Sequence, residues 1–213
     1  MMMRIDSVAS NPDRAGRYTV RFADSTVMRL YRQTVEDFGL YSGLELEQDA
    51  YGKLTDAAKA MSAKMRAVRI VAATSVSRMD LQQRLIQKGE DPQKAKEAVQ
   101  WMSDMSLVDD RRTAEQIVYR CIQKGYGRSR AKQMLYEKRI PKEYWDDVLQ
   151  DYPAQTEAIV SFLRSRLKDG YEEKDLKKAI DALLRRGHAY GDIRRGLERM
   201  SIQPEDFQEE SEW

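Results

Sequence analysis

The segment that decides the fold is Leu85-Ile86-Gln87-Lys88-Gly89, in which apolar residues lead into a basic residue and a glycine. A basic residue in a last helical turn suits the negative end of the helix dipole, and a following glycine adopts the left-handed backbone that closes many helices. The pattern returns at Leu135-Tyr136-Glu137-Lys138-Arg139 and at Leu183-Leu184-Arg185-Arg186-Gly187. The last residues of these segments stand 50 and 48 residues apart. Helix ends that recur at this spacing indicate an internal repeat.

Apolar residues also recur at fixed distances around each helix end. The positions six and ten residues beyond each end are apolar and one helical turn apart: Ala95 and Val99, Trp145 and Leu149, Ile193 and Leu197. A longer helix opens each unit, and in the first unit it is expected from Thr55 onward, with Ala57, Met61 and Met65 on one face. We therefore predict a mainly α protein of three tandem three-helix repeats that form an elongated curved solenoid.

Capping signals predict where the helices of the first unit begin. Ser77 stands three residues ahead of Asp80, as in a capping box. Asp91 followed by Pro92 is typical of an N-cap and a first-turn proline. These signals predict that a second and a third helix follow the long first one.

The second unit departs from the pattern because Arg139 stands where the flanking units have glycine. We expect its middle helix to end without the usual left-handed glycine. Pro141 is then expected to supply the stop, by starting the following helix after an extended Ile140.

Residues 1–54 show strand spacing instead of helix spacing. Tyr18, Val20 and Phe22 alternate with polar residues, residues 23–25 suit a turn, and residues 27–30 form a return arm. A third short strand is expected at residues 43–46 and one helical turn within residues 33–41. We predict a hairpin-based sheet of about three strands, which docks on the helices because so small a sheet is not stable alone. The resulting domains are an N-terminal strand-rich module at 1–54, repeats at 55–106, 107–152 and 153–200, and an acidic tail at 201–213.

The charge is unevenly distributed although the whole chain carries a formal net charge of only +2. Residues 61–199 hold 29 Lys and Arg against 21 Asp and Glu, whereas the tail is acidic and holds no base. Interleaved arginine and tyrosine suit phosphate contacts and base stacking. The alternative is that each cluster is the solvated face of an amphipathic helix. The contact candidates gather at the ends of two middle helices that repeat stacking is expected to place on one side: Arg128, Arg130, Lys132, Lys138, Arg139, Arg185 and Arg186.

The sequence carries no catalytic constellation. Cys121 is the only cysteine and His188 the only histidine, which disfavours a disulfide framework, a zinc site and Cys/His catalysis. We expect Cys121 to be a small buried hydrophobe and His188 a turn or surface residue. Residues 109–110, both Asp, more readily cap a helix than bind a metal, and residues 125–130 suit a turn between helices better than a phosphate loop. We predict a non-enzymatic protein with no metal or cofactor; without a leader or an apolar run long enough for a bilayer, we expect it in the cytoplasm.

Several of these motifs, in this order, resemble the RecX regulators of the bacterial recombinase RecA. The resemblance covers about residues 60–200 and includes the three repeats. The segments that carry it are Ser77-Arg78-Met79-Asp80-Leu81, Lys88-Gly89, Leu107-Val108-Asp109-Asp110 and Gly125-Tyr126-Gly127. The chain departs from the family pattern at Arg111-Arg112, where a basic residue followed by Phe is common, and at Lys138-Arg139, where Lys-Gly is common.

The resemblance implies a regulator of RecA that lies in the groove of the RecA–DNA filament. Members of the family usually lower ATP hydrolysis, filament extension and strand exchange, in recombination, DNA repair and the SOS response. We accordingly expect the RecA filament as partner, weak or filament-dependent binding to single- or double-stranded DNA, no membrane, and a monomer. The competing hypothesis is an autonomous nucleic-acid-binding helical-repeat protein, whose affinity for bare DNA would be high and steeply dependent on salt.

Overall fold

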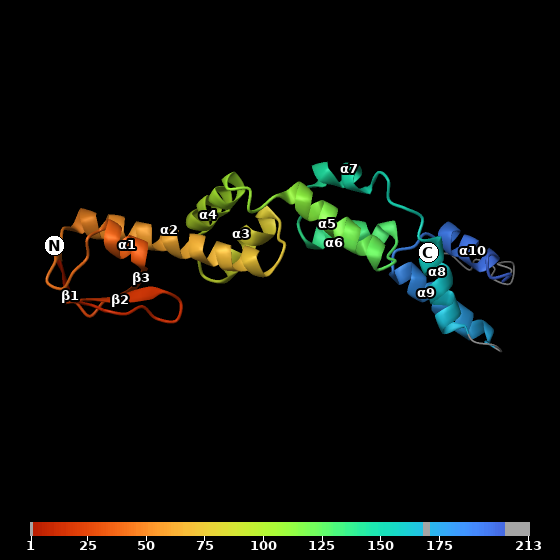
Figure 1. Ribbon diagram of the computed structural model, residues 1–213, viewed down its shortest axis with the longest axis horizontal. Coiled ribbons are helices and arrows are strands. Elements are labelled where there is room, and N and C mark those ends of the chain that lie inside the picture. Colours follow the sequence, from red (N-terminus) through yellow and green to blue (C-terminus); the bar gives the residue numbers. More distant parts are fainter. Residues whose placement is uncertain (1, 168–170, 203–213) are drawn as a thin grey trace, which may run out of the picture. The chain divides into compact units, whose positions relative to one another are not determined.

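The computed structural model describes residues 2–167 and 171–202, which fall into two compact units divided between Val108 and Asp109 (Figure 1). The first unit holds β1 (Met3–Val8), β2 (Arg17–Phe22), β3 (Val27–Tyr31), α1 (Arg32–Asp37), β4 (Glu45–Leu46), α2 (Gln48–Ala73), α3 (Arg78–Gln87) and α4 (Pro92–Asp104). The second holds α5 (Asp110–Gln123), α6 (Arg128–Glu137), the 3-10 helix η1 (Lys142–Tyr144), α7 (Trp145–Leu149), α8 (Thr156–Arg166), α9 (Glu173–Arg185) and α10 (Tyr190–Glu198). The predicted three-helix repeats and the N-terminal sheet are confirmed; the acidic tail lies almost wholly outside the described residues.

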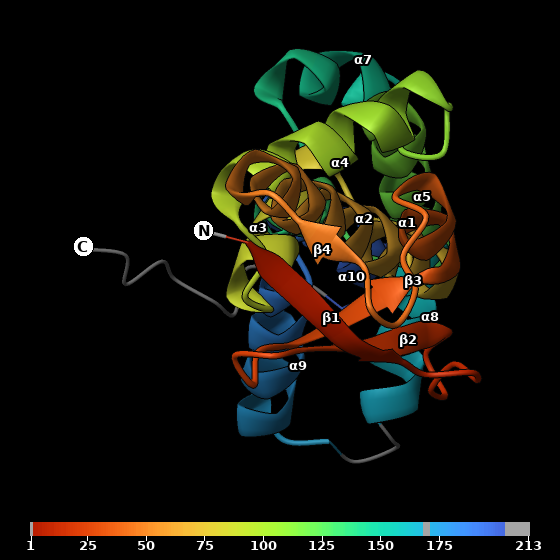
Figure 2. The same cartoon turned by 90° about the vertical axis from the view of Figure 1, so that its left-hand side faces the viewer.

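The N-terminal sheet has four antiparallel strands in the order β3-β2-β1-β4, one more than predicted (Figure 2). The hairpin of β2 and β3 is confirmed, and in its turn Ser25 adopts a left-handed φ of 68°. The strand that the prediction missed is β1, in which Met3 and Ile5 are buried while Arg4 and Asp6 are exposed. This alternation is the signal of a strand that is buried on one face.

Helix α2 begins at Gln48, earlier than the predicted start at Thr55. Its first two turns belong to the sheet module, because Leu54 is fully buried in the core that the strands form. Further along the same helix, Ala63 and Ala67 are fully buried in the core of the first repeat. One continuous helix therefore contributes to both cores of the first unit, which ties the sheet to the repeat.

The middle helix of each repeat ends in the same hydrogen-bonded closure. The residue after the helix cap has a positive φ: 86° at Gly89, 52° at Arg139 and 82° at Gly187. In the second repeat the Arg139 amide donates to the Tyr136 carbonyl at 2.9 Å and the Ile140 amide to the Leu135 carbonyl at 3.0 Å. The expectation that this helix ends by another route is thus wrong. Arg139 itself takes the left-handed conformation and bears the strain that glycine avoids.

The leucines that define the repeat register are fully buried: Leu85, Leu135 and Leu183. The third helix of the second repeat is shorter than predicted, since it consists of η1 and the five-residue α7 after Pro141. Trp145 is therefore only half-buried, although it packs against the core of its repeat and its Nε1 donates to the Ile140 carbonyl at 3.0 Å.

Candidate functional site

The second and third repeats meet where the N-terminus of α6 touches the C-terminal end of α9. The Gly127 amide donates to the Arg186 carbonyl at 3.0 Å, and the Ser129 amide donates to the Gly187 carbonyl at 3.2 Å. A Cβ atom on Gly127 would lie 1.9 Å from the Gly187 oxygen, and one on Gly187 would lie 2.2 Å from the Arg130 nitrogen. The two backbones are in direct contact, which only glycine allows.

Arg186 covers the aromatic side chains beside this contact. Its guanidinium carbon lies 4.7 Å from the centre of the Phe162 ring and 5.8 Å from that of Tyr126. Behind Tyr126, the Tyr152 hydroxyl donates to the Tyr126 carbonyl at 2.7 Å, and burial raises the pKa of Tyr152 to about 12. The Arg186 side chain thus stacks on two aromatic rings of the fold, and this stacking does not neutralise its positive charge.

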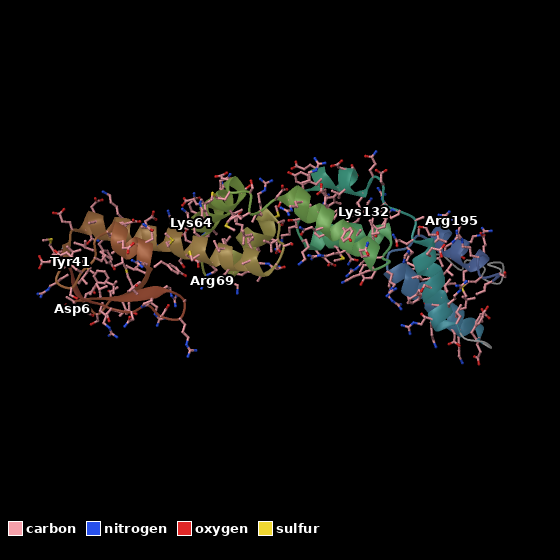
Figure 3. All side chains as sticks on the ribbon, in the orientation of Figure 1. Asp6, Tyr41, Lys64, Arg69, Lys132 and Arg195 are labelled. Atoms are coloured by element: carbon pink, nitrogen blue, oxygen red, sulfur yellow. The ribbon has the colours of Figure 1, made fainter. Side chains whose placement is uncertain are left out.

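The basic residues of α6 surround the same contact. Arg128 and Lys132 are exposed and one helical turn apart, so they share a face of α6, and Figure 3 labels Lys132 there. Arg130 is half-buried and its Nη1 lies 3.4 Å from Glu137 Oε1. Arg185, next to Arg186, is exposed. Among the described residues, neither Lys132 nor Arg185 forms an ion pair.

We call the basic residues around this contact the junction surface: Arg128, Arg130, Lys132, Arg185 and Arg186. The two remaining candidates, Lys138 and Arg139, lie at the opposite end of α6. Ten residues of α helix separate the two ends by about 15 Å. The expectation that both middle-helix ends share one side is therefore only partly met, because the C-terminal end of α9 meets the N-terminus of α6 and not its C-terminus.

His188 is buried beneath this contact. It was expected to be a turn or surface residue; it does follow a turn, but it is not on the surface. It follows the turn after α9, and its Nε2 lies 3.1 Å from the Gly125 carbonyl oxygen. Burial lowers the pKa of the imidazole, a stronger effect than the opposing hydrogen bond to Gly125. The ring is therefore predominantly neutral at pH 7 and able to donate to that carbonyl.

The other residues singled out in the sequence have structural roles. Cys121 is buried as predicted, with its Sγ 3.4 Å from the Met134 sulfur, and burial raises the pKa of its thiol. Asp109 caps α5, where its carboxylate accepts from the Arg112 amide at 3.0 Å. A turn joins α5 to α6 as expected, but it spans residues 124–127, and residues 128–130, which were expected within it, form the first turn of α6.

The described ranges also yield two negative findings. They contain no group of three or more His, Cys, Asp or Glu side chains placed to hold a metal ion. Within the same ranges, no helix has both the length and the apolar character that crossing a bilayer requires.

The glycines of the junction are what the sequence reasoning missed. Gly125, Gly127 and Gly187 were assigned to turns, but the close approach of two backbones was not foreseen. The available signal was the concentration of glycine at two segments 60 residues apart. Nothing in the local sequence indicates that Arg186 stacks on Phe162, which lies 24 residues earlier in the chain.

Fold and surface define the class of this molecule, a tandem three-helix-repeat protein with a cationic junction between its second and third repeats. A family model described as "RecX, second three-helix domain" matches residues 109–149, which cover α5, α6, η1 and α7. Curated relatives named "Regulatory protein RecX" align over much of the chain. The protein from Vibrio campbellii is 26% identical over 152 residues, which are 70% of this chain and 96% of the relative. That from Halorhodospira halophila is 27% identical over 131 residues, 60% of this chain and 81% of the relative.

Solved structures support the same fold. A structure titled "Crystal structure of regulatory protein RecX" superposes with a TM-score of 0.62 at 19% identity and covers 91% of this chain and 99% of its own. A second, of RecX from Lactobacillus salivarius, gives a TM-score of 0.59 at 20% identity over 68% of this chain and 99% of its own. In sequence and in fold, this chain is therefore similar to proteins named RecX.

Proposed function

We propose that this protein regulates the RecA recombinase by binding the RecA–DNA filament, and that it lowers ATP hydrolysis, filament extension and strand exchange. The observation that carries the proposal is the similarity of this chain to RecX proteins: a model of the second RecX three-helix domain matches residues 109–149, and the curated relatives that align with the chain are named regulatory proteins. Regulation is a binding function, and it needs a surface and no reactive centre. That requirement agrees with the structural roles of Cys121 and Asp109.

The junction surface is the proposed contact with the filament. Its exposed members, Arg128, Lys132 and Arg185, offer charge to DNA phosphates or to acidic patches on the filament. The support for this assignment is that the underlying backbone is held by hydrogen bonds between two repeats. The cations are consequently presented from a fixed scaffold, which lowers the conformational entropy lost on binding. Lys138 and Arg139 would belong to a separate contact at the other end of α6.

The test is DNA-dependent ATP hydrolysis by RecA from the same organism, titrated with this protein at substoichiometric ratios. The wild-type chain is expected to reduce hydrolysis at well below one regulator per RecA, because action at filament ends or at few sites does not need saturation. The variant Arg128→Glu/Arg130→Glu/Lys132→Glu is expected to need at least about tenfold more protein for the same inhibition, since it removes or reverses three contacts.

The matched control reverses three exposed cations of the second unit outside the junction surface, Lys142, Arg164 and Lys177. It makes the same change in net charge and is expected to inhibit nearly as well as the wild type. Equal loss in both variants would mean that overall charge matters and the junction surface does not. No effect of the wild type on hydrolysis, together with tight and salt-sensitive binding to bare DNA, would favour the autonomous nucleic-acid-binding protein instead.

A further inference from the structure

A second cationic feature lies in the first unit and includes none of the residues of the junction surface. It is a pocket of about 440 Å³ where the β1–β2 loop and the start of β2 meet the C-terminal half of α2 and the end of α3. The uncharged lining residues are Ala15, Ile70, Ala73 and Thr74. Its cationic lining residues are Arg17, Arg66, Arg69, Arg84 and Lys88. None of the described lining residues is acidic.

Three of these cations are held in place by carboxylates that stand outside the lining. The pairs are Arg17 with Asp13 at 2.8 Å, Arg66 with Glu90 at 2.5 Å, and Arg84 with Asp80 at 3.0 Å. Glu90 is almost completely buried and also accepts from the Ser62 hydroxyl at 3.0 Å, so it fixes Arg66 from below. A guanidinium has five N–H donors, and such a pair leaves several of them for a further ligand.

The other two cations have no carboxylate partner among the described residues. Arg69 donates from Nη2 to the Tyr31 hydroxyl at 2.8 Å and from Nε to the Met65 carbonyl at 3.2 Å, which orients it without neutralising it. It lies on the side of α2 that faces the strands (Figure 3). Lys88 is exposed at the C-terminal cap of α3. The pocket therefore holds two positive charges that no carboxylate compensates.

We propose that this pocket binds the phosphodiester backbone of a nucleic acid, with two neighbouring phosphates matching the charges of Arg69 and Lys88. The charged lining side chains are donors only, which a phosphate satisfies completely. A peptide segment would also bring backbone N–H groups that need acceptors. Thr74 has the only side chain in the described lining that can accept a hydrogen bond. The described lining contains no aromatic side chain, so the contact is to the backbone and independent of base sequence.

The same cations have a purely structural explanation that the experiment must exclude. Arg84 and Lys88 stand at the C-terminal end of α3, where positive charge stabilises the helix dipole, and Arg69 is held by its hydrogen bonds to Tyr31 and Met65. In that case the pocket needs no ligand. The two explanations differ in what happens to nucleic-acid affinity when the uncompensated charges are removed.

The experiment measures binding of the full chain to a fluorescent 20-nucleotide thymidine strand by anisotropy, over a series of salt concentrations. The test variant is Arg69→Gln/Lys88→Gln, which leaves no carboxylate without its partner. The control is Arg29→Gln/Lys96→Gln, which removes two exposed cations of the same unit outside this pocket. Because both variants lower the net charge by two, they share the long-range electrostatic effect. No recombinase is present, so the result does not depend on the proposed function.

Loss of two phosphate contacts on a single strand is expected to reduce the slope of log affinity against log salt by about 1.4, which corresponds to about 25-fold weaker binding at 0.1 M salt. The control is expected to change affinity less than about threefold. Lys88→Gln alone leaves the Arg69–Tyr31 hydrogen bond intact and is expected to reduce the slope by about 0.7. This single variant keeps the test valid if the double variant fails to fold. Equal effects of test and control variants would overturn the proposal. The proposal would also be overturned if poly-glutamate of equal charge competed as strongly as unlabelled thymidine strand, because the pocket would then bind acidic peptides.

Discussion

Substitution of Gly127 by alanine tests the contact between the second and third repeats. The added Cβ would lie 1.9 Å from the Gly187 oxygen and 2.4 Å from the His188 nitrogen, both of them backbone atoms that cannot swing aside. Ordinary contacts need about 3.4 Å, so the two helix ends must separate by roughly 1.5 Å. Gly127 has a φ of −77°, which alanine adopts freely, and the effect is therefore purely one of space.

The magnitude follows from the hydrogen bonds that such a separation breaks. They are the Gly127 amide to the Arg186 carbonyl, the Ser129 amide to the Gly187 carbonyl, and the His188 ring to the Gly125 carbonyl. At about 1 kcal/mol for each net hydrogen bond, the loss is about 3 kcal/mol. Alanine in place of glycine also restricts the unfolded chain, which returns a few tenths of a kcal/mol.

The assay is equilibrium unfolding in urea, followed by tryptophan fluorescence. In a Trp101→Phe/Trp213→Phe background Trp145 is the sole tryptophan and reports on the second unit. The matched control is Gly191→Ala, where an added Cβ meets nothing within 4 Å inside α10, and it is expected to stabilise by up to about 1 kcal/mol. If the free energy of unfolding of Gly127→Ala differs from that of its parent by less than about 0.5 kcal/mol, the close contact does not exist in solution.

Three further outcomes follow from the second unit. Trp145→Ala should lower the free energy of unfolding by about 2 kcal/mol, less than for a fully buried Trp, because the ring is half-buried; a change below about 0.5 kcal/mol in urea unfolding monitored by circular dichroism would place it on the surface. Arg139→Gly should raise the melting temperature, because glycine adopts a φ of 52° without the strain of about 1 kcal/mol that a residue with a side chain bears. A lower melting temperature would mean that the contacts of the arginine side chain outweigh this strain. The His188 pKa is lowered on folding, so the unfolded chain binds more protons and stability should fall as the pH drops below about 6.5. Between pH 7.5 and 5.5 this loss should be smaller in His188→Gln, and an unchanged profile would assign the pH dependence to other groups.

The repeats could be predicted because the forces that make them are local. Helix ends, caps and apolar spacing are encoded within a few residues, and Ser77 and Asp91 cap α3 and α4 as their sequence context indicates. The start of α2 was placed too late because its first turns pack on strands and contribute few apolar residues to the helical face. The strand β1 was missed because its alternation of Met3 and Ile5 with Arg4 and Asp6 covers only four residues, and its pairing with β2 and β4 comes from distant parts of the chain.

The candidate site was less predictable because it depends on contacts between distant segments. Which end of α6 meets α9 is decided by the glycine contact, and no local pattern encodes that choice. Position 139 is a second case in which the local sequence did not predict the structure. Its sequence suggested a different helix end, whereas the tertiary structure imposes the left-handed closure on an arginine.

The hydrogen bond between the Gly127 amide and the Arg186 carbonyl has a consequence for how the second unit opens. Because the donor belongs to one repeat and the acceptor to the next, this amide proton exchanges with solvent only when the two repeats part. The neighbouring amide of Ala131, which donates to the Gly127 carbonyl, can remain protected in that event. Hydrogen exchange at one glycine would thus measure the coupling free energy between neighbouring repeats, the quantity that decides whether a repeat array unfolds piecewise or as a whole.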